Sequence, residues 1–234
     1  MNLYPNVEQV GFLEKNKLTM AGGEFCGNAT RSAALILLKG RPGKINLKVS
    51  GVKNYLKAGI RKNGETYSEM PIFNDVNKVI SIPNTNSTEF LVEMQGIYHL
   101  INFNYKQIEN LSTDEIKKQA KSRIEQLNLN KLSAVGIIYV NQKKEQYLIT
   151  PVVYVRKIDT LFLETACGSG STALGLVLVK NRKSSINLIP IIQPSGMSIK
   201  ISIDYKNNSF KKAFIQGPCE IITNNESLNV KIQL

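Results

Sequence analysis

The same short pattern occurs twice in this chain, and each time it opens a stretch of small and apolar residues. The segment CGNAT begins at Cys26 and the segment CGSGS begins at Cys167, and each follows closely after a glutamate, Glu24 or Glu164. Alanine, leucine and isoleucine follow both segments at the density typical of a helix. The repetition therefore predicts two related halves, each with a central helix that begins at a Cys-Gly pair.

Most of the remaining chain consists of short runs rich in β-branched residues and bounded by glycine, asparagine, proline or lysine. A third helix is predicted after Ser112, because Ser112 and Glu115 have the spacing of a capping box before the run IKKQAKSRIEQL. This is an α+β pattern, with several strands wrapped around a helix in each half, and not the alternation of a doubly wound sheet. The predicted strands are Glu8–Leu13, Lys44–Val49, Asn54–Ile60, Val79–Ile82, Glu89–Met94, Tyr98–Phe103, Ala134–Val140, Gln146–Tyr154, Ser185–Ile192, Ser198–Ile203 and Ala213–Gln216.

Composition argues against several classes of protein. The net charge is +12, but the lysines occur singly or in pairs and form no basic stripe interleaved with aromatic residues. We therefore expect a solvated basic surface and no nucleic-acid partner, with a polyanion partner as the alternative. The longest apolar stretches, Ala33–Leu38 and Ala173–Val179, are far shorter than the roughly 18 residues of a membrane span. No secretory leader is visible and three cysteines do not suggest a disulfide framework, so the cytoplasm is the expected compartment.

A cysteine at the start of a helix has chemistry that a buried structural cysteine lacks. Unpaired N–H groups and the positive end of the helix dipole favour its thiolate form. Glycine after each cysteine permits a ligand to approach, so the backbone N–H groups of Gly27, Asn28, Gly168 and Ser169 are predicted to hold a carboxylate. Two such helix starts that face each other would place a sulfur on either side of that ligand.

That arrangement suits the inversion of a stereocentre next to a carboxylate. A single base returns a proton only to the face from which it came, whereas a thiolate and a thiol on opposite faces exchange roles with the direction of the reaction. Cys26 and Cys167 are therefore the predicted acid/base pair for racemisation of a free amino acid. The sequence contains no lysine motif for pyridoxal phosphate and no metal-ligand cluster, so we expect the thiols to work without a cofactor or a metal.

Other interpretations of these residues remain open at this point. Cys219 has the character of a buried structural cysteine, and His99, the only histidine, lies in a β-like run where a lone histidine is usually structural. A cysteine hydrolase that uses one thiol with His99 leaves the second Cys-Gly pair unexplained. A module that binds an amino acid without turning it over is the non-catalytic alternative.

The motifs resemble those of the cofactor-independent diaminopimelate epimerase superfamily, in order and over nearly the whole chain. CGNATRSA is similar to its first cysteine motif, ACGSGSTA to its second, and GIYHL to the segment that carries the family's histidine. The resemblance implies two pseudo-symmetric lobes, residues 1–73 and 74–222, each a β-roll or barrel around its helix, with the active site in the cleft between them. It implies that residues 223–234 complete the first lobe, and that His99 and Glu164 position the thiols.

The chain departs from diaminopimelate epimerases where those enzymes bind the second amino acid group of their substrate. Ile158 and Asp159 stand in the places of a Glu-Arg pair whose arginine grips the distal carboxylate. An asparagine in the histidine segment is also missing, since Ile97 and Tyr98 precede His99. A distal amino acid head group would therefore be poorly held.

A closer similarity is to the histidine racemase branch of the superfamily, which supplies D-histidine for opine-type metallophores in some bacteria. EQVGFLE, EFCGNAT, KVSG and ACGSGS are similar to that branch in sequence and order. The resemblance implies that Glu8 recognises the imidazole of the substrate, and a carboxylate can accept an imidazole N–H. Relatives carry a further N-terminal stretch, so the first lobe is expected to lack its first strand. L-histidine is the expected substrate. The alternatives are diaminopimelate, another amino acid acted on by a racemase of the same fold, or a truncated homologue without activity. A homodimer is the default assembly.

Overall fold

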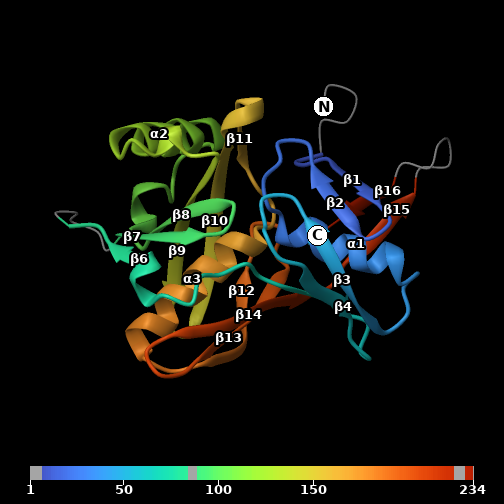
Figure 1. The fold of residues 1–234 in the computed structure, drawn as a ribbon. Coiled ribbons are helices and arrows are strands. Elements are labelled where there is room, and N and C mark those ends of the chain that lie inside the picture. Colours follow the sequence, from blue (N-terminus) through green and yellow to red (C-terminus); the bar gives the residue numbers. More distant parts are fainter. Residues whose placement is uncertain (1–6, 84–88, 224–229, 234) are drawn as a thin grey trace.

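The computed structural model describes residues 7–83, 89–223 and 230–233, and all three expected helices lie within them (Figure 1). Two of them begin directly after a cysteine of a Cys-Gly pair, so Cys26 and Cys167 are the N-caps of α1 and α3. The predicted capping box of α2 is also formed, because Ser112 Oγ accepts from the N–H of Glu115 and the Glu115 carboxylate accepts from the N–H of Ser112. The helices are α1 (Gly27–Leu37), α2 (Thr113–Gln126) and α3 (Gly168–Arg182).

The described strands form one large sheet and one small one. The large sheet has 14 strands and begins with β1 to β5, crosses to β14 and β13, and continues through β12, β10, β9, β8 and β7 to β6, with β11 paired to β10. With three helices packed on this sheet, the fold is α+β, as predicted. Its strands are β1 (Gly11–Glu14), β2 (Lys17–Met20), β3 (Gly43–Val49), β4 (Leu56–Ile60), β5 (Thr66–Glu69), β6 (Val79–Ser81), β7 (Glu89–Met94), β8 (Ile97–Asn102), β9 (Ala134–Lys143), β10 (Gln146–Val155), β11 (Thr160–Leu163), β12 (Ile186–Ile192), β13 (Ser198–Tyr205) and β14 (Phe210–Gly217).

The large sheet curls around two helices, one in each half of the molecule (Figure 1). Strands β2 to β5 contact α1, whereas β6 to β9, β12, β13 and β14 contact α3. β14 joins the two halves, because it pairs antiparallel with β13 along one edge and with β5 along the other. Ile215, in the middle of β14, lies opposite Ile201 of β13 and Ser68 of β5. The lobe boundaries at 1–73 and 74–222 stay a prediction, since this strand belongs equally to both halves.

The two central helices differ in how deeply they are buried. Every residue of α3 from Gly168 to Val179 is buried, which fits its apolar residues on all sides of the helix. In α1 the buried residues lie mainly in the first two turns, up to Ala34. The N-terminal ends of both helices, which carry the cysteines, therefore lie in the interior of the molecule.

A separate pair of strands lies near the C-terminus. β15 (Glu220–Thr223) pairs with β16 (Val230–Gln233), and Figure 1 shows both on the side of the molecule where α1 lies. The expectation that residues 223–234 complete the first lobe concerns mostly residues 224–229 and 234, which lie outside the described part of the chain.

Three strands of the large sheet were not predicted from the sequence. β2, β5 and β11 are four residues long, too short to show a clear alternation of polar and apolar residues. Each obtains its hydrogen bonds from neighbours that are distant in sequence or follow a turn: β2 pairs with β1 and β3, β5 with β4 and β14, and β11 with β10. The strand expected from Glu8 begins only at Gly11, which leaves Glu8 and Gln9 in an extended segment outside the sheet.

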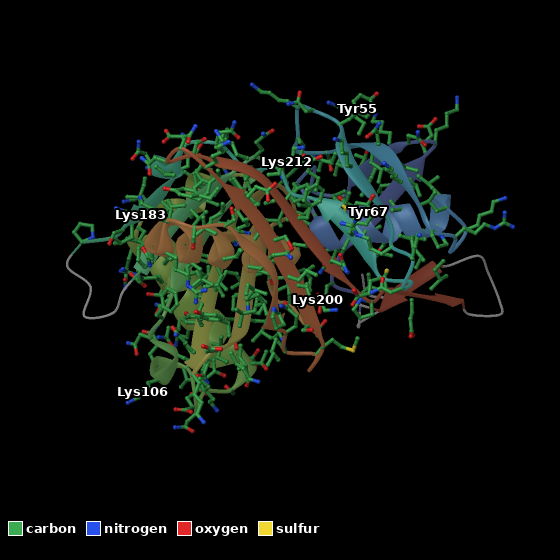
Figure 2. The ribbon with its side chains drawn as sticks, turned by 90° about the horizontal axis from the view of Figure 1, so that it is seen from below. Tyr55, Tyr67, Lys106, Lys183, Lys200 and Lys212 are labelled. Atoms are coloured by element: carbon green, nitrogen blue, oxygen red, sulfur yellow. The ribbon has the colours of Figure 1, made fainter. Side chains whose placement is uncertain are left out.

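Lysine side chains are spread over the surface (Figure 2). Lys106 and Lys183 lie on the C-terminal half, and Lys200 and Lys212 lie on β13 and β14. Lys200 forms an ion pair with Glu65, 2.7 Å between nitrogen and oxygen. None of the helices in the described ranges is long and apolar enough to cross a bilayer.

Candidate active site

Cys26 caps the N-terminus of α1 with its own sulfur. The Sγ atom accepts a hydrogen bond from the backbone N–H of Ala29 at 3.3 Å, and the backbone carbonyl of Cys26 accepts from the Thr30 hydroxyl at 2.7 Å. Cys26 itself has an extended backbone and only 9% of its surface is exposed. The sulfur is thus fixed at the helix start by local contacts within four residues.

Cys167 repeats this geometry at the start of α3. Its Sγ atom accepts from the N–H of Gly170 at 3.3 Å, and its carbonyl accepts from the Ser171 hydroxyl at 2.8 Å. A further contact, 3.6 Å between sulfur and oxygen, joins Cys167 to the side chain of Ser169. The sequence pattern that occurs twice therefore corresponds to one structural unit that occurs twice, a cysteine N-cap.

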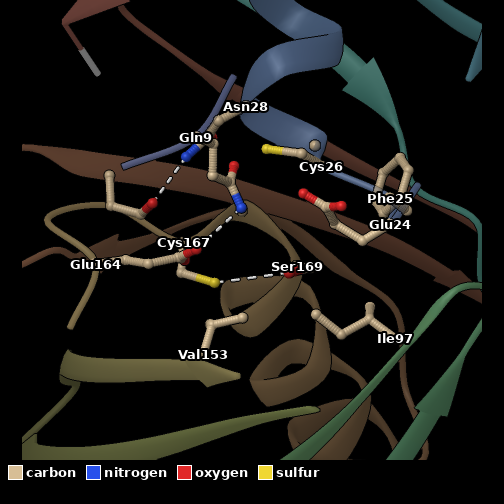
Figure 3. A pocket seen from close by; sticks show the side chains of 13 residues that line it. Gln9, Glu24, Phe25, Cys26, Asn28, Ile97, Val153, Glu164, Cys167 and Ser169 are labelled. Atoms are coloured by element: carbon tan, nitrogen blue, oxygen red, sulfur yellow. Dashed lines mark hydrogen bonds between the residues drawn. The ribbon is translucent and has the colours of Figure 1, made fainter. Parts of the chain in front are cut away.

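Both cysteines line one pocket between the two helix starts (Figure 3). α1 bounds the pocket on the side of Cys26 and α3 on the side of Cys167, while Ile97 of β8 and Val153 of β10 form part of its wall. Glu24 and Glu164, the glutamates that precede the two cysteines, also line it. The structure thus brings together two thiols that are distant in the sequence.

The protonation of the thiols differs from the sequence-based expectation. Burial raises the pKa of the Cys26 thiol to about 12, although the N–H of Ala29 acts to lower it, and the charge of Glu164 raises it further. Burial likewise raises the pKa of Cys167 well above its usual value, and Glu164 raises it more. The expectation that the helix start would bring the pKa of each thiol below its usual value is therefore wrong. The helix N–H groups do stabilise the thiolate, but burial and the charge of Glu164 destabilise it by more.

Glu164 is the ionisable group most closely associated with Cys167. Only 6% of Glu164 is exposed, and burial raises the pKa of its carboxyl to about 8, although the interaction with Cys167 lowers it. The amide of Gln9 donates to Glu164 Oε1 at 3.3 Å (Figure 3). A carboxyl with such a pKa can exchange a proton with a neighbouring group near neutral pH.

Asn28 connects the two helix starts. Its side-chain amide donates to the carbonyl of Ala166, the residue before Cys167, at 2.9 Å (Figure 3). Its side-chain oxygen accepts from the buried guanidinium of Arg31 at 3.0 Å, which fixes the orientation of the amide. Because α1 and the segment before α3 belong to different halves, this bond fixes one thiol relative to the other.

The glycines after the cysteines serve close packing of the two helix starts. A Cβ atom on Gly168 would lie 2.6 Å from Ile215 Cδ1, and a Cβ atom on Gly27 would lie 3.0 Å from the same atom. Gly27 would also meet Met70 at 3.0 Å. The two N-terminal turns therefore pack on one isoleucine of β14, a constraint that the sequence did not reveal.

Three of the four predicted anion-binding groups at the helix starts are available, whereas the backbone N–H of Asn28 interacts with the Cys26 sulfur. The N–H groups of Gly27, Gly168 and Ser169 have no acceptor among the residues that the structure describes. The N–H of Cys167, in contrast, donates to the side chain of Gln193 at 2.9 Å. The first turns can thus accept a carboxylate from a ligand, which stays a prediction for all four residues, Asn28 included.

A second pocket adjoins the first and shares Gln9, Glu24, Val153 and Glu164 with it. This outer pocket encloses about 320 Å³, open solvent included. Apolar side chains form much of its wall, and no lysine, arginine or histidine is among its lining residues in the described part of the chain. Its further lining residues are Glu8, Val10, Ala21, Val155, Ile158, Thr160 and Phe162.

Glu8 lies in the outer pocket, beside the segment that leads to Cys167. Its Oε1 atom accepts from the backbone N–H of Thr165 at 2.7 Å. The negative charges of Glu8 and Glu24 both raise the pKa of Glu164. Three carboxyl groups from three segments therefore line the outer pocket, and none forms an ion pair among the described residues.

His99 lies behind the wall of the inner pocket. It is fully buried on β8, two residues after the wall residue Ile97 and on the same face. A Cβ atom on Gly136 would lie 2.4 Å from His99 Nδ1, so the glycine makes room for the imidazole. Burial lowers the pKa of His99 to about 3, and neither ring nitrogen has a partner among the described residues. The structure places His99 in neither pocket, and its role in positioning the thiols stays a prediction.

Three site residues were missed in the sequence. Gln9 contacts Glu164, Gln193 caps the start of α3, and Glu24 lines both pockets. Of these three, only Glu24 could have been found from the sequence, because a glutamate closely precedes each of the two cysteines. Cys219, the third cysteine, lies outside both pockets and contacts Ser32 at 3.5 Å.

The chain is similar in sequence to known proteins over most of its length. A family model described as the N-terminal domain of the histidine racemase CntK matches residues 3–226. A histidine racemase of Fusobacterium nucleatum subsp. nucleatum is 32% identical over 229 residues, which cover 94% of this chain and 80% of that protein. A histidine racemase of Staphylococcus aureus (strain Mu50) is 28% identical over 204 residues, which cover 81% and 71%.

Solved structures show the same fold in a distant enzyme. The crystal structure of a hydroxyproline epimerase from Agrobacterium vitis superposes with a TM-score of 0.57 and covers 89% of this chain and 70% of the other. The two sequences are only 9% identical. The similarity therefore concerns the fold alone.

Proposed function

The chain belongs to the histidine racemase family, and from that premise we propose that it interconverts L- and D-histidine with two thiols and without a cofactor. The observation that carries the proposal is the single pocket lined by two cysteine N-caps, Cys26 and Cys167, one on each helix start. One thiol removes the α-proton from one face of the substrate, and the other donates a proton to the opposite face. The roles reverse for the opposite direction.

The helix starts bind the α-carboxylate in this proposal. The free N–H groups of Gly27, Gly168 and Ser169, with that of Asn28, point from two helix ends whose dipoles both favour negative charge. The same groups stabilise the charge that spreads onto the carboxylate when the α-proton is removed. The hydrogen bond from Asn28 to Ala166 keeps the two helix starts at a fixed separation during this step.

Glu164 generates the first thiolate. Both thiols hold their protons at the start of the reaction, because burial raises the pKa of each. Glu164, whose pKa is about 8, accepts the proton of Cys167: the S–H bond breaks, an O–H bond forms, and the net charge of the pair does not change. The Cys167 thiolate then removes the α-proton while the Cys26 thiol supplies one, and the reverse sequence begins with Cys26 as the base.

The outer pocket favours an imidazole over a second amino acid group. Glu8 can accept an imidazole N–H, and the apolar wall that includes Ile158 and Phe162 suits a flat ring. The distal carboxylate of diaminopimelate would enter a pocket that contains three carboxyl groups and no cationic lining residue among those described. Such an approach of like charges is unfavourable in a partly desolvated site.

We propose His99 as a neutral support for the pocket wall. Its imidazole lies next to Gly136, two residues along β8 from the wall residue Ile97, and in this proposal it supports the wall on which the substrate packs.

We also propose that the enzyme works in the cytoplasm on a free amino acid, with no nucleic-acid or membrane partner. The lysines spread over the surface and the three free cysteines support this proposal. A homodimer remains the default assembly.

The proposal is tested by incubating a panel of L-amino acids that includes histidine and diaminopimelate with the protein in deuterated water. We expect histidine alone to become racemic by chiral chromatography and to carry deuterium at the α-carbon. Cys26→Ser and Cys167→Ser should each abolish racemisation, because inversion needs both faces.

Cys219→Ser is the matched control, since this cysteine lies outside both pockets, and it should retain wild-type activity. Full racemisation by either single-thiol variant contradicts the two-thiol mechanism. Inversion of diaminopimelate instead of histidine contradicts the assigned substrate but not the mechanism.

A further inference from the structure

Glu24 is a buried carboxylate for which the described residues supply no counter-charge. Only 7% of the residue is exposed, and its Oε2 atom has no hydrogen-bond partner among the described residues. The ion pairs found in the described part of the chain involve Glu65, Glu89 and Glu93, and not Glu24. A buried charged group without a partner is strongly unfavourable, so it points to a partner that arrives with a ligand.

The space around this carboxylate is made by a glycine. A Cβ atom on Gly22 would lie 2.4 Å from Glu24 Oε2 and 2.7 Å from Val155 Cγ1, so any side chain at position 22 would displace the carboxylate. The backbone of Gly22 does not have a positive φ, so no turn geometry requires glycine there. Figure 3 shows the Glu24 carboxylate inside the pocket, near Cys26.

The other two carboxyl groups of the site already have protein partners. Glu8 accepts from the N–H of Thr165, and Glu164 interacts with Gln9 and Cys167. Glu24 is the one of the three with a buried oxygen, Oε2, that has no partner among the described residues, and it lines both the inner and the outer pocket. Neither pocket contains a lysine, arginine or histidine among its described lining residues, so the missing cation must belong to the ligand.

The four substituents of the substrate α-carbon identify that cation. In the proposed function, which this inference deepens, the hydrogen faces a thiol, the carboxylate binds the helix starts, and the side chain extends into the outer pocket. The remaining substituent is the α-ammonium. We infer that Glu24 binds the α-ammonium group of the amino acid substrate and so selects amino acids over acids that lack this group.

The inference is tested by the affinity for an amino acid and for its des-amino analogue. In the Cys167→Ser background, where turnover is blocked, calorimetry compares L-histidine with 3-(imidazol-4-yl)propanoic acid. We expect histidine to bind about 10- to 100-fold more tightly, the size expected of one charge-assisted hydrogen bond. Glu24→Gln should bring the two affinities within about threefold by weakening histidine only, since it removes the charge but keeps the shape.

Two further variants make the result specific. Gly22→Ala, which moves the carboxylate without changing its charge, should also lower the preference for histidine. Glu14→Gln, an exposed glutamate of β1 outside both pockets, is the matched control and should leave the preference unchanged.

Equal weakening of both ligands by Glu24→Gln, or an unchanged preference, overturns the inference, as does a protein that binds both ligands equally well. These outcomes are separate from failure of the proposed function, which appears as absence of α-proton exchange in the wild-type protein. If the panel identifies another amino acid, that amino acid and its des-amino analogue replace the histidine pair.

Discussion

At the scale of single residues, the two thiols show that a helix N-terminus does not by itself set the charge of a cysteine. Each sulfur accepts one backbone N–H bond at 3.3 Å, yet burial raises the pKa of both thiols. In the proposed mechanism, proton transfer therefore begins at a different group. Glu164 is the group whose pKa, about 8, lies in the range where an enzyme works.

We predict that activity rises with pH through about 8. Glu164 must be deprotonated to accept the proton of Cys167, and its pKa is raised above the usual carboxyl range, so the active form increases as pH rises toward and above about 8. The expected measurement is kcat/KM for histidine between pH 6 and 9.5, with a slope of one on the acid side.

Glu164→Gln should lower kcat by about 100-fold or more, which is the size of effect expected when a general acid or base is removed. It should also remove the rise of kcat/KM on the acid side of the pH profile. Glu65→Gln is the comparison variant. Glu65 immediately precedes β5 and forms an ion pair with Lys200, and this variant should keep the wild-type pH profile of kcat/KM. A wild-type profile that is flat through pH 8 would show that Glu164 does not start the reaction.

At the scale of secondary structure elements, the first turns of α1 and α3 depend on a strand that neither of them follows in sequence. Ile215 of β14 fills the space left by Gly27 and Gly168, and the closer contact is at Gly168. The glycines that follow Cys26 and Cys167 are thus needed for packing. The distance from each glycine to Ile215 Cδ1 decides how well that position tolerates a larger side chain.

We predict that Gly168→Ala is more destabilising than Gly27→Ala. The added methyl group would lie 2.6 Å from Ile215 Cδ1 in the first case and 3.0 Å in the second, where flexible Met70 atoms can also move. Overpacking of this kind costs about 1–3 kcal/mol, and we expect this range for Gly168→Ala and less than about 1 kcal/mol for Gly27→Ala. Denaturant unfolding of both variants measures the difference.

Ile215→Val supplies a second test, because valine lacks the Cδ1 atom. In that background Gly168→Ala should cost less than in the wild-type chain, so the double-mutant cycle should show a favourable coupling. Additive effects would mean that the methyl group is accommodated elsewhere.

The elements themselves were predictable to different degrees. The helices follow from local signals: a cap within four residues of each start and apolar residues at helical spacing. Strands such as β9 and β10 are long runs of β-branched residues and were also expected. β5 was not, because its residues, Thr66–Glu69, form a strand only by pairing with β4 and β14.

At the scale of the whole molecule, one sheet passes through both halves. β14 pairs with β13 on one side and β5 on the other, and the helix starts pack on the same strand. The hydrogen bond from Asn28 to Ala166 adds a polar link between the halves. Neither half can unfold without exposing the edge of this strand.

We predict that both halves unfold in one cooperative transition. The reactivity of the two buried thiols toward a thiol reagent reports on each half, Cys26 beside α1 and Cys167 beside α3, in variants that keep only one cysteine. Both thiols and far-UV circular dichroism should give the same denaturant midpoint.

Leu47→Ala removes a fully buried side chain of β3 in the N-terminal half, at a cost of about 2–5 kcal/mol. It should lower the denaturant midpoint reported by the reactivity of Cys167 as much as the midpoint reported by Cys26. A shift confined to Cys26 would show that the halves are independent domains.

The sequence by itself determined where the helices begin, which residues cap them, and that each of the two Cys-Gly units would begin a helix. These features depend on hydrogen bonds and side-chain spacing within about one turn of helix, which a sequence displays directly. Most of the site residues that the sequence proposed do gather at the two pockets, and His99 lies behind their wall.

Only the tertiary structure decided the direction in which the pKa of each thiol shifts, the packing of both helix starts on Ile215, and the burial of Glu24 Oε2 without a described partner. Each depends on how far a group is removed from water and on which distant segments cover it. Desolvation and charge act through space and not along the chain, so no local pattern in the sequence contains them.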